Sequence, residues 1–317
     1  MKDASLTDDF ALSAARAAIA AAISSARLIG RGDEKAADQA AVDAMRNALN
    51  AMNMRGRIVI GEGERDEAPM LYIGEKVGTG EGPEIDIALD PLEGTTLTAK
   101  AMPNALCVIA FAQRGGLLHA PDTYMEKLAI GPGYAEGVVD LDAPADENVK
   151  TLARAKGVKP EEIGVCVLDR PRHSGIIEAL RSVGARVHLI SDGDVAGVIN
   201  TTKPKTGIDM YVGQGGAPEG VLAAAALKCV GGQFQGRLVF RNEEEKARAA
   251  RAGVVDFKKR YTLNDLASKD AVFVATGVTP GSMLDGVRFT KECVHTHTLV
   301  MNSATRTVSE LRVKHPI

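Results

Sequence analysis

The chain has 317 residues, of which 45% are hydrophobic and 25% are charged, and its formal net charge is -3. This composition excludes intrinsic disorder, which requires low hydrophobicity together with a high net charge. It also gives no basic field that would attract nucleic acid or an anionic membrane surface. Aromatic residues are only 4% of the chain and tryptophan is absent, which argues against a base-stacking surface. Neither nucleic acid nor a membrane is therefore an expected partner.

The cysteines and the N-terminal segment indicate a soluble, cytoplasmic protein. None of the cysteines forms a C-x-x-C pair, and each lies in or beside an apolar run, as expected of buried, reduced thiols: Cys107, Cys166, Cys229 and Cys293. The first residues lack the basic, apolar and cleavage regions of a signal peptide. The apolar stretch Ala14–Ile23 is interrupted by Arg16 and is too short to span a bilayer.

The first half of the chain predicts two helices followed by strands. Hydrophobic periodicity favours helices over Thr7–Ile29, with Thr7 as N-cap, and over Glu34–Met52. Apolar or alternating runs predict three strands: Arg57–Ile60, Glu84–Leu89 and Ala105–Ala112. The second of these strands is expected to stop at Asp90-Pro91.

The second half alternates strands with helices. Strands are predicted at Ile163–Leu168, Arg186–Ile190, Asp209–Val212, Leu238–Phe240 and Val272–Ala275, and helices at Ser174–Val183, Asp194–Asn200, Pro218–Val230 and Glu243–Gly253. This alternation favours an α/β fold in which helices cover a sheet that is parallel at least in part. The polar segment Pro144–Lys159 predicts a boundary between two subdomains, 1–150 and 151–317.

Carboxylates follow two of the predicted strands directly. Asp90 and Glu93 lie three residues apart in a proline-glycine turn after one strand, and Glu62 follows Arg57–Ile60 between two glycines. Hard cations such as Mg²⁺ and Mn²⁺ prefer clustered oxygen ligands of this kind. The alternative is a turn whose acids only cap backbone N–H groups.

Asp38 is a third candidate, because it lies on an otherwise apolar helical stripe completed by Val42, Met45, Leu49 and Met52. A carboxylate on such a stripe is costly unless it is paired or binds a metal. Because Asp38 stands at the end of the stripe, simple exposure to solvent is the alternative.

A glycine-rich segment, Val212–Gly220, connects a predicted strand to a helix and contains Glu219. Glycines before a helix N-terminus can form an anion site from backbone N–H groups. The segment also resembles a dinucleotide fingerprint, but Pro218 replaces its third glycine. A nucleotide-binding oxidoreductase is thus a weaker alternative, and it leaves the acidic cluster unexplained.

Basic residues could bind a phosphate. Arg170-Pro171-Arg172-His173 precedes a predicted helix, and guanidinium groups bind phosphate in a bidentate manner; a plain surface cluster is the alternative. Ser191-Asp192-Gly193-Asp194 ends the next strand and could bind sugar hydroxyls or cap the following helix.

Taken in order, these motifs resemble class II fructose-1,6-bisphosphatase. The resemblance rests on Gly61–Glu64, Asp66–Met70, Asp90–Thr95, Ala120–Leu128, Pro171–His173, Asp192–Asp194 and Gly215–Gly220. Single motifs of this set are weak signals, but the ordered set is specific and covers nearly the whole chain. Cyanobacterial members of the family also hydrolyse sedoheptulose 1,7-bisphosphate.

The resemblance implies a lithium-sensitive-phosphatase-like sugar phosphatase fold with alternating helix and sheet layers. It implies Mn²⁺ or Mg²⁺ held by Asp38, Glu62, Asp90, Glu93 and Glu219. Substrate contacts would come from Glu93, Gly94, Thr95, Tyr124, Arg170, Pro171, Arg172, Asp192, Gly193, Asp194 and Gly216. Thr95 would orient the attacking water, with Asp38 relaying its proton.

The implied reaction is hydrolysis of the 1-phosphate of fructose 1,6-bisphosphate, as used in gluconeogenesis, or of sedoheptulose 1,7-bisphosphate, by a homo-oligomer (dimer or tetramer). An inositol-monophosphatase-like enzyme is the alternative within phosphatases, and it would have less need of a second phosphate grip. Two departures from relatives stand out. Glu34 follows Gly-Arg-Gly-Asp where some relatives have lysine, and the stretch Arg241–Lys259 is shorter than in some bacterial relatives.

Overall fold

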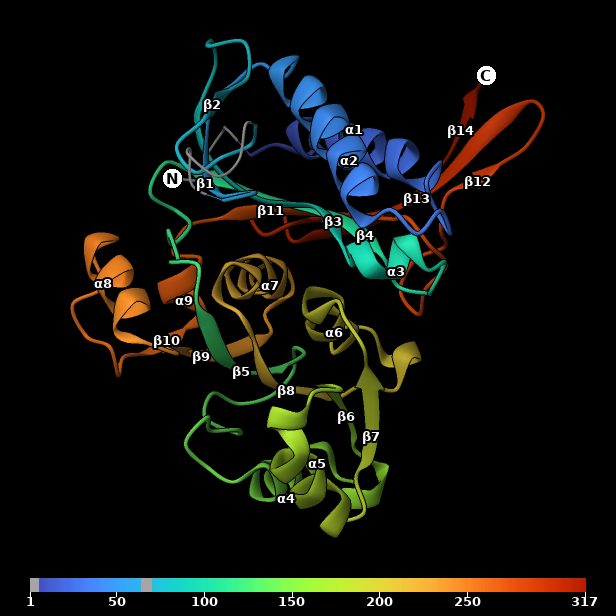
Figure 1. Cartoon of the computed structure of the whole chain (residues 1–317). Helices are drawn as coiled ribbons and strands as arrows, with labels where there is room; N and C mark the ends of the chain where they lie inside the picture. Colours follow the sequence, from blue (N-terminus) through green and yellow to red (C-terminus); the bar gives the residue numbers. More distant parts are fainter. Residues whose placement is uncertain (1–5, 64–69) are drawn as a thin grey trace. The chain divides into compact units, whose positions relative to one another are not determined.

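The computed structural model describes residues 6–63 and 70–317. The chain folds into two compact units, of which unit 1 comprises residues 1–119 and 267–317 and unit 2 comprises Ala120–Leu266. Each unit has its own sheet (Figure 1). Glu64 and Asp66–Pro69, which belong to the motif after the first predicted strand, lie outside the described residues.

Unit 1 is built on a sheet with the strand order β12-β13-β11-β4-β3-β1-β2, to which β14 is added beside β13. β1 and β3 are parallel, whereas every other described pair in this sheet is antiparallel. The elements are α1 (Asp8–Ala26), α2 (Glu34–Asn50), β1 (Arg55–Ile60), β2 (Lys76–Val77), β3 (Glu84–Glu93), α3 (Thr95–Ala99), β4 (Leu106–Gln113), β11 (Ala271–Gly277), β12 (Arg288–Phe289), β13 (Cys293–Asn302) and β14 (Thr307–Pro316).

Helices α1 and α2 pack against each other and against the sheet of unit 1 (Figure 1). Both begin at side-chain caps, because Thr7 accepts the N–H of Phe10 at 3.1 Å and Asp33 accepts that of Ala36 at 2.9 Å. The buried side of α1 consists almost entirely of alanine, so the helix can approach its neighbours closely. Both predicted helices are confirmed, with ends a few residues shorter than predicted.

Strand β3 extends through the turn at which it was predicted to end. Its register shifts between Asp90, opposite Val108, and Glu93, opposite Leu106, so one extra residue forms a bulge. Pro91 lies inside the bulge, where its missing N–H costs no ladder hydrogen bond. The prediction that the strand stops at Asp90-Pro91 is therefore wrong: the chain bends there without leaving the sheet.

Unit 2 contains a mixed sheet with the order β10-β9-β5-β8-β6-β7. β6 is parallel to β7 and β8, and the other pairs are antiparallel. The helices and strands are β5 (Tyr124–Ile130), α4 (Ala145–Lys156), β6 (Gly164–Leu168), α5 (Ser174–Ser182), β7 (Arg186–Ile190), α6 (Asp194–Asn200), β8 (Met210–Gly216), α7 (Ala217–Val230), β9 (Gln233–Val239), α8 (Glu243–Arg251), β10 (Arg260–Thr262) and α9 (Leu263–Leu266), with short 3₁₀ turns η1 (Pro160–Glu162), η2 (Pro171–His173) and η3 (Pro204–Thr206).

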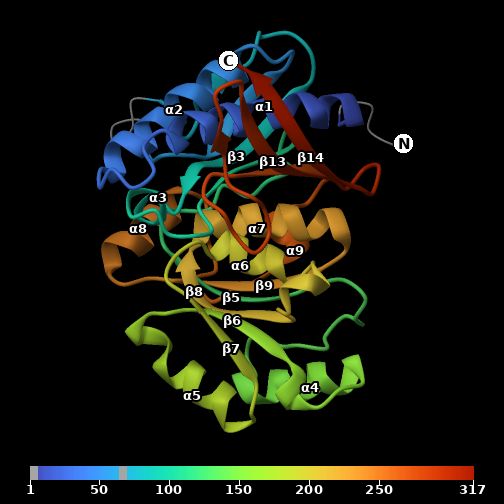
Figure 2. The same cartoon turned by 90° about the vertical axis from the view of Figure 1, so that its right-hand side faces the viewer.

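Helices cover both faces of this sheet. Figure 2 shows α6 and α7 on one face and α4 and α5 on the other. On the second face, Val149 and Leu152 of α4 and Leu180 of α5 share a buried cluster with sheet residues Leu128 and Met210. Together with unit 1, these layers confirm the predicted α/β class with a partly parallel sheet.

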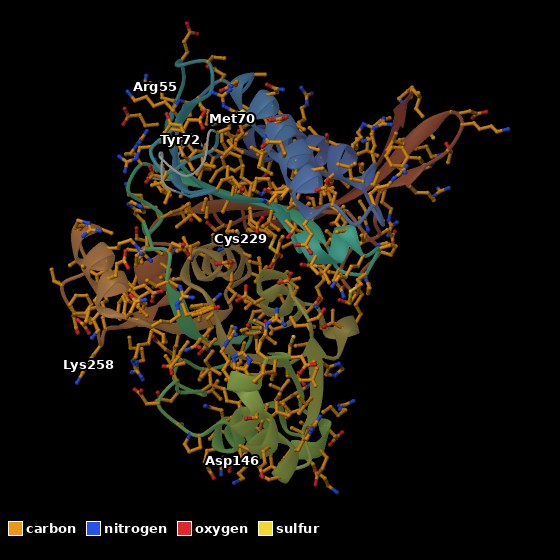
Figure 3. All side chains as sticks on the ribbon, viewed as in Figure 1. Arg55, Met70, Tyr72, Asp146, Cys229 and Lys258 are labelled. Carbon is orange, nitrogen blue, oxygen red and sulfur yellow. The ribbon has the colours of Figure 1, made fainter. Side chains whose placement is uncertain are left out.

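The boundary predicted between residues 150 and 151 lies inside α4. The polar segment that suggested it is an amphipathic helix: Asp146 lies at the periphery of unit 2 (Figure 3), whereas Val149, Leu152 and Ala153 are buried. Its charged residues occupy the outer side, which is why the segment has the composition of a linker.

The prediction of buried cysteines is confirmed for Cys107, Cys166 and Cys229, whereas Cys293 is only half-buried, and none of the four forms a disulfide. The elements that were not predicted include α4, β5, with Glu126 and Lys127 in its middle, and the hairpin formed by β13 and β14. The short elements α3, α9, β2, β10 and β12 were not predicted either. Among the described residues, no helix is both long and apolar enough to cross a membrane.

The core of unit 1 depends on Phe111, which is fully buried in β4 and meets the ring of Phe10 edge-on at 5.4 Å. We expect Phe111→Ala to lower the free energy of unfolding by about 3–5 kcal/mol, because a large cavity replaces the ring. Phe289→Ala is the control, since that ring is 39% exposed, and should cost about 1 kcal/mol or less. Urea denaturation of both variants measures the difference, and equal losses would contradict this description of the core.

Candidate active site

The chain passes from β3 directly into α3 through Glu93, Gly94 and Thr95. Glu93 is buried, and Gly94 adopts a left-handed conformation with φ of 87° as the N-cap of α3, whose first residue is Thr95. A Cβ at Gly94 would come within 2.8 Å of Leu97, so glycine allows this sharp entry into the helix. Asp90 accepts the N–H of Leu92 at 3.0 Å through Oδ1. Backbone capping by the turn acids therefore does occur, and it involves one oxygen of Asp90.

The parallel pairing of β1 and β3 places Glu62 and Asp90 at the same edge of the sheet. Ile60 on β1 pairs with Ala88 on β3, and each carboxylate follows two residues later, just beyond the last paired residues of the two strands. Asp90 also pairs with Val108, next to Cys107 on β4. Burial raises the pKa of the Cys107 thiol, and the charges of Asp90 and Asp38 add to this effect. Asp90 and Asp38 therefore both lie near Cys107.

Asp38 and Glu62 form a hydrogen-bonded pair of carboxyl groups. Burial, followed by the charge of Asp38 and the hydrogen bond to it, raises the pKa of Glu62 to about 8. The pKa of Asp38 is also raised, mainly by burial, although the hydrogen bond from Glu62 lowers it. At neutral pH the pair thus shares a proton, with the protonated Glu62 donating to the Asp38 carboxylate. A cation could take the place of that proton.

This edge of unit 1 suits a hard divalent cation. Its donors are all carboxylate oxygens, which Mg²⁺ and Mn²⁺ prefer, and Asp38 with Glu62 already shows the mutual repulsion that a cation relieves. In the described part of the chain, however, no group of three His, Cys, Asp or Glu side chains converges closely enough to hold an ion. Metal binding would require these carboxylates to draw closer together.

Unit 2 contains Glu219, whose side chain folds back over the start of its own helix. A Cβ at Gly216 would lie 2.0 Å from Glu219 Oε2, and this oxygen is buried without a hydrogen-bond partner among the described residues. Burial, and then the charge of Asp194, raises the pKa of Glu219. An unpartnered buried carboxylate oxygen is costly, and a cation would satisfy it.

The glycines before Glu219 do not form a nucleotide-binding loop. Gly213, Gly215 and Gly216 belong to strand β8, and each lies against a side chain where a Cβ would be too close: His173 at 3.2 Å, Asp194 at 1.9 Å and Glu219 at 2.0 Å, respectively. These glycines allow three polar side chains to pack directly on the β8 backbone. This observation removes the structural basis for the oxidoreductase alternative.

Asp194 forms a buried ion pair with Lys127, a residue that the sequence motifs did not single out. Lys127 Nζ lies 2.5 Å from Asp194 Oδ2, and the two side chains are only 1% and 6% exposed, respectively. A buried ion pair of this kind is costly to desolvate and becomes strongly destabilising if one partner is removed. A buried lysine requires an acidic partner, but Glu126 precedes Lys127 in the sequence, so the local pattern did not mark Lys127 as buried.

The Asp192–Asp194 segment forms the turn between β7 and α6. Gly193 is the N-cap of α6 with φ of 82°, and no side chain of the Ser191–Asp194 segment caps the helix, contrary to the alternative interpretation of this segment. Asp192 is half-buried, and its Oδ1 accepts the N–H of Gly193 at 3.0 Å. Sugar hydroxyl binding by this turn stays a prediction.

The two arginines after β6, Arg170 and Arg172, have different hydrogen-bond partners. The guanidinium carbon of Arg172 lies 4.9 Å from the centre of the Tyr124 ring, and its Nε and Nη2 donate to the Gln214 carbonyl at 3.3 and 2.7 Å. Arg170 instead donates to the carbonyl of Asp169 at 3.1 Å. Pro171 starts the 3₁₀ turn η2 between the two arginines.

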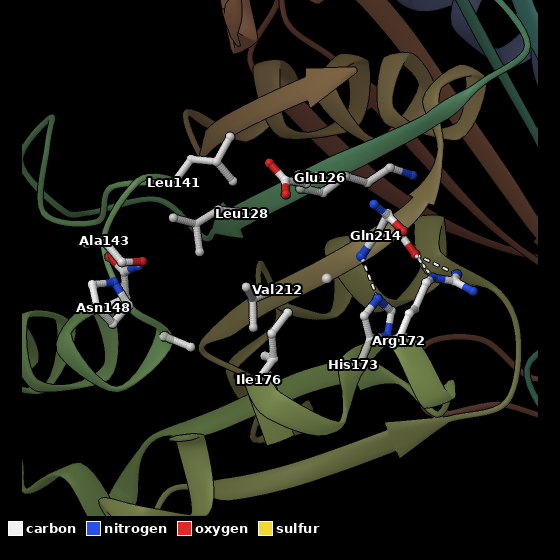
Figure 4. A pocket seen from close by; sticks show the side chains of 14 residues that line it. Glu126, Leu128, Leu141, Ala143, Asn148, Arg172, His173, Ile176, Val212 and Gln214 are labelled. Atoms are coloured by element: carbon white, nitrogen blue, oxygen red, sulfur yellow. Dashed lines mark hydrogen bonds between the residues drawn. The ribbon is translucent and has the colours of Figure 1, made fainter. Parts of the chain in front are cut away.

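His173 positions this turn, a role that the sequence did not reveal. The pairing of β6 with β8 ends at Cys166 and Tyr211. Beyond these residues, the imidazole of His173 bridges the two segments. Its Nδ1 lies 2.7 Å from the Leu168 carbonyl, and its Nε2 accepts the N–H of Gln214 at 2.8 Å (Figure 4). Burial and then the nearby charge of Arg172 lower its pKa, which favours the neutral ring with the proton on Nδ1.

A cavity of about 310 Å³ lies in unit 2 beside these residues. Arg172, His173 and Gln214 line one end, and Leu141 and Asn148 line the other (Figure 4). The predicted residues are thus divided between the units. Unit 1 contains Asp38, Glu62, Asp90, Glu93, Gly94 and Thr95, and unit 2 contains Tyr124, Arg170–Arg172, Asp192–Asp194, Gly216 and Glu219.

Known proteins resemble this chain over most of its length. The profile of the family described as "Bacterial fructose-1,6-bisphosphatase, glpX-encoded" matches residues 8–315. The chain is 46% identical to the "D-fructose 1,6-bisphosphatase class 2/sedoheptulose 1,7-bisphosphatase" of Synechococcus elongatus over a 320-residue alignment, which covers 93% of this chain and 92% of the relative. It is also 46% identical to the protein of the same name from Synechococcus sp. strain JA-2-3B'a(2-13), over 91% of this chain and 90% of the relative.

The shared proton of Asp38 and Glu62 predicts pH-dependent metal binding. The pKa of Glu62 in the folded, metal-free protein, about 8, lies above its ordinary value of 4.5, so Mn²⁺ must displace a proton below pH 8. We expect about one proton to be released per bound ion at pH 7, and affinity to rise with pH until about pH 8. Titration calorimetry in buffers of different ionisation enthalpy measures this release.

The matched variants are Glu62→Gln, which should lose the proton release and bind Mn²⁺ more weakly, and Glu84→Gln at the exposed start of β3, which should behave as wild type. Proton release that does not change between pH 6 and pH 9 would contradict this description of the pair.

Proposed function

Because this chain belongs to the glpX-encoded family of bacterial fructose-1,6-bisphosphatases, we propose that it hydrolyses the 1-phosphate of D-fructose 1,6-bisphosphate. The products are fructose 6-phosphate and inorganic phosphate, as gluconeogenesis requires. The names of the two cyanobacterial relatives also include sedoheptulose 1,7-bisphosphatase, and we propose this bisphosphate as a second substrate. The observation that carries the proposal is the set of carboxylates that follow the paired residues of β1 and β3, with Thr95 two residues after Glu93.

Class II fructose-1,6-bisphosphatases are metal-dependent phosphatases, and Mn²⁺ or Mg²⁺ is the cofactor that we propose. In unit 1, Asp38, Glu62, Asp90 and Glu93 are the proposed ligands; the shared proton of the first two supports this role. Glu219 in unit 2 is proposed for the same role because its Oε2 is buried and has no described partner. A bound divalent cation supplies positive charge for the phosphoryl oxygens and lowers the pKa of an attacking water.

Thr95 is proposed to orient the attacking water. Its hydroxyl belongs to the first residue of α3, and a threonine hydroxyl is a poor base by itself. Asp38 is proposed, from the family resemblance, as the group to which the proton of the water can pass. Phosphate monoester hydrolysis proceeds mainly through positioning and electrostatics, so no covalent intermediate on the protein is needed.

The remaining predicted residues are proposed to bind the substrate. Glu93, Gly94 and Thr95 would contact the sugar and the phosphate that leaves, and Asp192, Gly193, Asp194 and Gly216 would contact the sugar. Tyr124 with Arg170, Pro171 and Arg172 would hold the distal phosphate; the stacking of Arg172 on Tyr124 supports this assignment. An inositol-monophosphatase-like activity would make little use of that second grip.

A cytoplasmic homo-oligomer is the form in which we propose that the protein works. This proposal rests on the family resemblance and on the four cysteines, none of which forms a disulfide.

The activity is tested by measuring phosphate release from a panel of sugar phosphates, with and without Mn²⁺. We expect fructose 1,6-bisphosphate to be hydrolysed faster than fructose 1-phosphate or inositol 1-phosphate, chelation to abolish the activity, and added metal to restore it. Asp90→Asn should lower kcat by at least about 100-fold while the protein stays folded, because a charged metal ligand is lost. Full activity after exhaustive dialysis against EDTA would overturn the metal requirement.

Thr95→Ala tests the role proposed for the hydroxyl. Because that role concerns only the attacking water, kcat should fall by about 100-fold or more while KM for fructose 1,6-bisphosphate stays within about twofold. Thr96→Ala, at the next position of α3, is the matched control and should retain normal turnover. Steady-state kinetics at saturating metal give both constants. A Thr95→Ala protein with near wild-type turnover would exclude this assignment.

A further inference from the structure

Three strand ends meet at Tyr124 in unit 2. Tyr124 is the first residue of β5, and it pairs with Gly216 at the end of β8 and with Val239 at the end of β9. Because β5 is antiparallel to both neighbours, its amino end lies beside the carboxyl ends of β8 and β9. The chain continues from Val239 to Arg241, which is therefore placed next to Tyr124.

Two arginines from distant parts of the chain converge on this tyrosine. The guanidinium carbon of Arg172 lies 4.9 Å from the ring centre and that of Arg241 lies 5.0 Å from it. Each contact is a favourable cation–π interaction. The two guanidinium groups nevertheless carry like charges, so an anion bound by both would be stabilised more than by either alone.

We propose that Arg241 is a further substrate-binding residue, which together with Arg172 binds the phosphate that is not hydrolysed and so selects sugar bisphosphates over monophosphates. This inference rests on the proposed function and extends its phosphate grip beyond the residues that the family motifs identify. Its chemical basis is the match between the guanidinium fork and a phosphate dianion.

Arg241 is held in place by Glu245, a residue of the first turn of helix α8. Glu245, one helical turn later in α8, accepts Nε of Arg241 at 2.6 Å and Nη2 at 2.5 Å through Oε1. Its Oε2 accepts the backbone N–H of the same arginine at 2.7 Å. Asn242 caps the helix by accepting the N–H of Glu245 at 2.9 Å. The side chain of Arg241 is thus fixed at both its backbone and its head group.

The difference in exposure between Glu245 and Arg241 indicates that this contact orients the arginine for binding. Glu245 is 1% exposed, whereas the Arg241 side chain is 59% exposed. An ordinary ion pair with one exposed partner adds little stability, and burying the carboxylate costs desolvation. The result is an exposed guanidinium whose orientation is set in advance, so that little side-chain entropy is lost when an anion binds.

Donor geometry supports the same assignment. A guanidinium has five N–H donors. The described hydrogen bonds of Arg241 use Nε and Nη2, both toward Glu245, and those of Arg172 also use Nε and Nη2, toward the Gln214 carbonyl. Each arginine therefore keeps Nη1 available for an oxyanion. A phosphate dianion has three oxygens that can accept from both groups.

The experiment compares substrates with and without the distal phosphate. Steady-state kinetics are measured for wild type and Arg241→Met with fructose 1,6-bisphosphate and with fructose 1-phosphate. We expect KM for the bisphosphate to rise about tenfold or more, because a charge-assisted contact to the unreactive phosphate is lost. We also expect kcat for the bisphosphate, and both constants for fructose 1-phosphate, to stay within about twofold of wild type.

Two further variants complete the series. Arg248→Met, on the same helix α8, removes an exposed arginine that lies 4.0 Å from Glu244 and should leave all constants unchanged. Arg241→Lys keeps the charge but loses the fork, so it should raise KM by an intermediate factor. It also keeps the test available if Arg241→Met does not fold.

Calorimetric binding of fructose 6-phosphate to the metal-free protein gives a readout that is independent of turnover. Arg241→Met should weaken this binding by the same factor by which KM rises. An unchanged KM for the bisphosphate, or an equal rise for fructose 1-phosphate, would overturn the inference. If wild type releases no phosphate from any bisphosphate, the proposed function fails by itself, and binding of inorganic phosphate to wild type and to Arg241→Met still decides whether Arg241 contributes to an anion site.

Discussion

Buried carboxylates with too few positive partners are the constraint on which the rest of this molecule depends. In unit 1, burial and the neighbouring Asp38 raise the pKa of Glu62 to about 8. The two carboxyl groups therefore share a proton at neutral pH, which relieves their repulsion. In unit 2, one buried lysine neutralises Asp194, while Glu219 keeps a buried oxygen without a described partner. Such buried carboxylates cost stability in the metal-free fold, and the cation that we propose would relieve this cost on binding.

Strand β8 shows how the fold accommodates these groups. Its glycines leave the backbone bare at three positions, and His173, Asp194 and Glu219 pack directly against it. A side chain at any of these positions would push a functional group away from the sheet. The same strand end presents the Gln214 carbonyl, which receives the guanidinium of Arg172. The glycine-rich end of β8 thus supports the buried carboxylates Asp194 and Glu219 as well as Arg172, which is proposed to bind a phosphate.

The proposed phosphate-binding arginines depend on structural residues in unit 2. His173 bridges β6 and β8 where their pairing ends, and Glu245 orients Arg241. Neither side chain would contact the substrate in the proposed assignment. Each fixes a cationic group before an anion arrives, so that binding loses little conformational entropy.

The sequence by itself determined the helices α1 and α2, most strands, and the positions of the carboxylates, because these depend on local periodicity and on motifs of a few residues. It also determined the family, because several motifs occur in the same order. It did not reveal the bulge at Pro91, since that feature depends on the register with β4. Only the tertiary structure decided that Lys127 pairs with Asp194, 67 residues away, and that Arg241 reaches Tyr124. Such contacts join distant segments through sheet pairing, and no local pattern of residue types specifies which strand ends will meet.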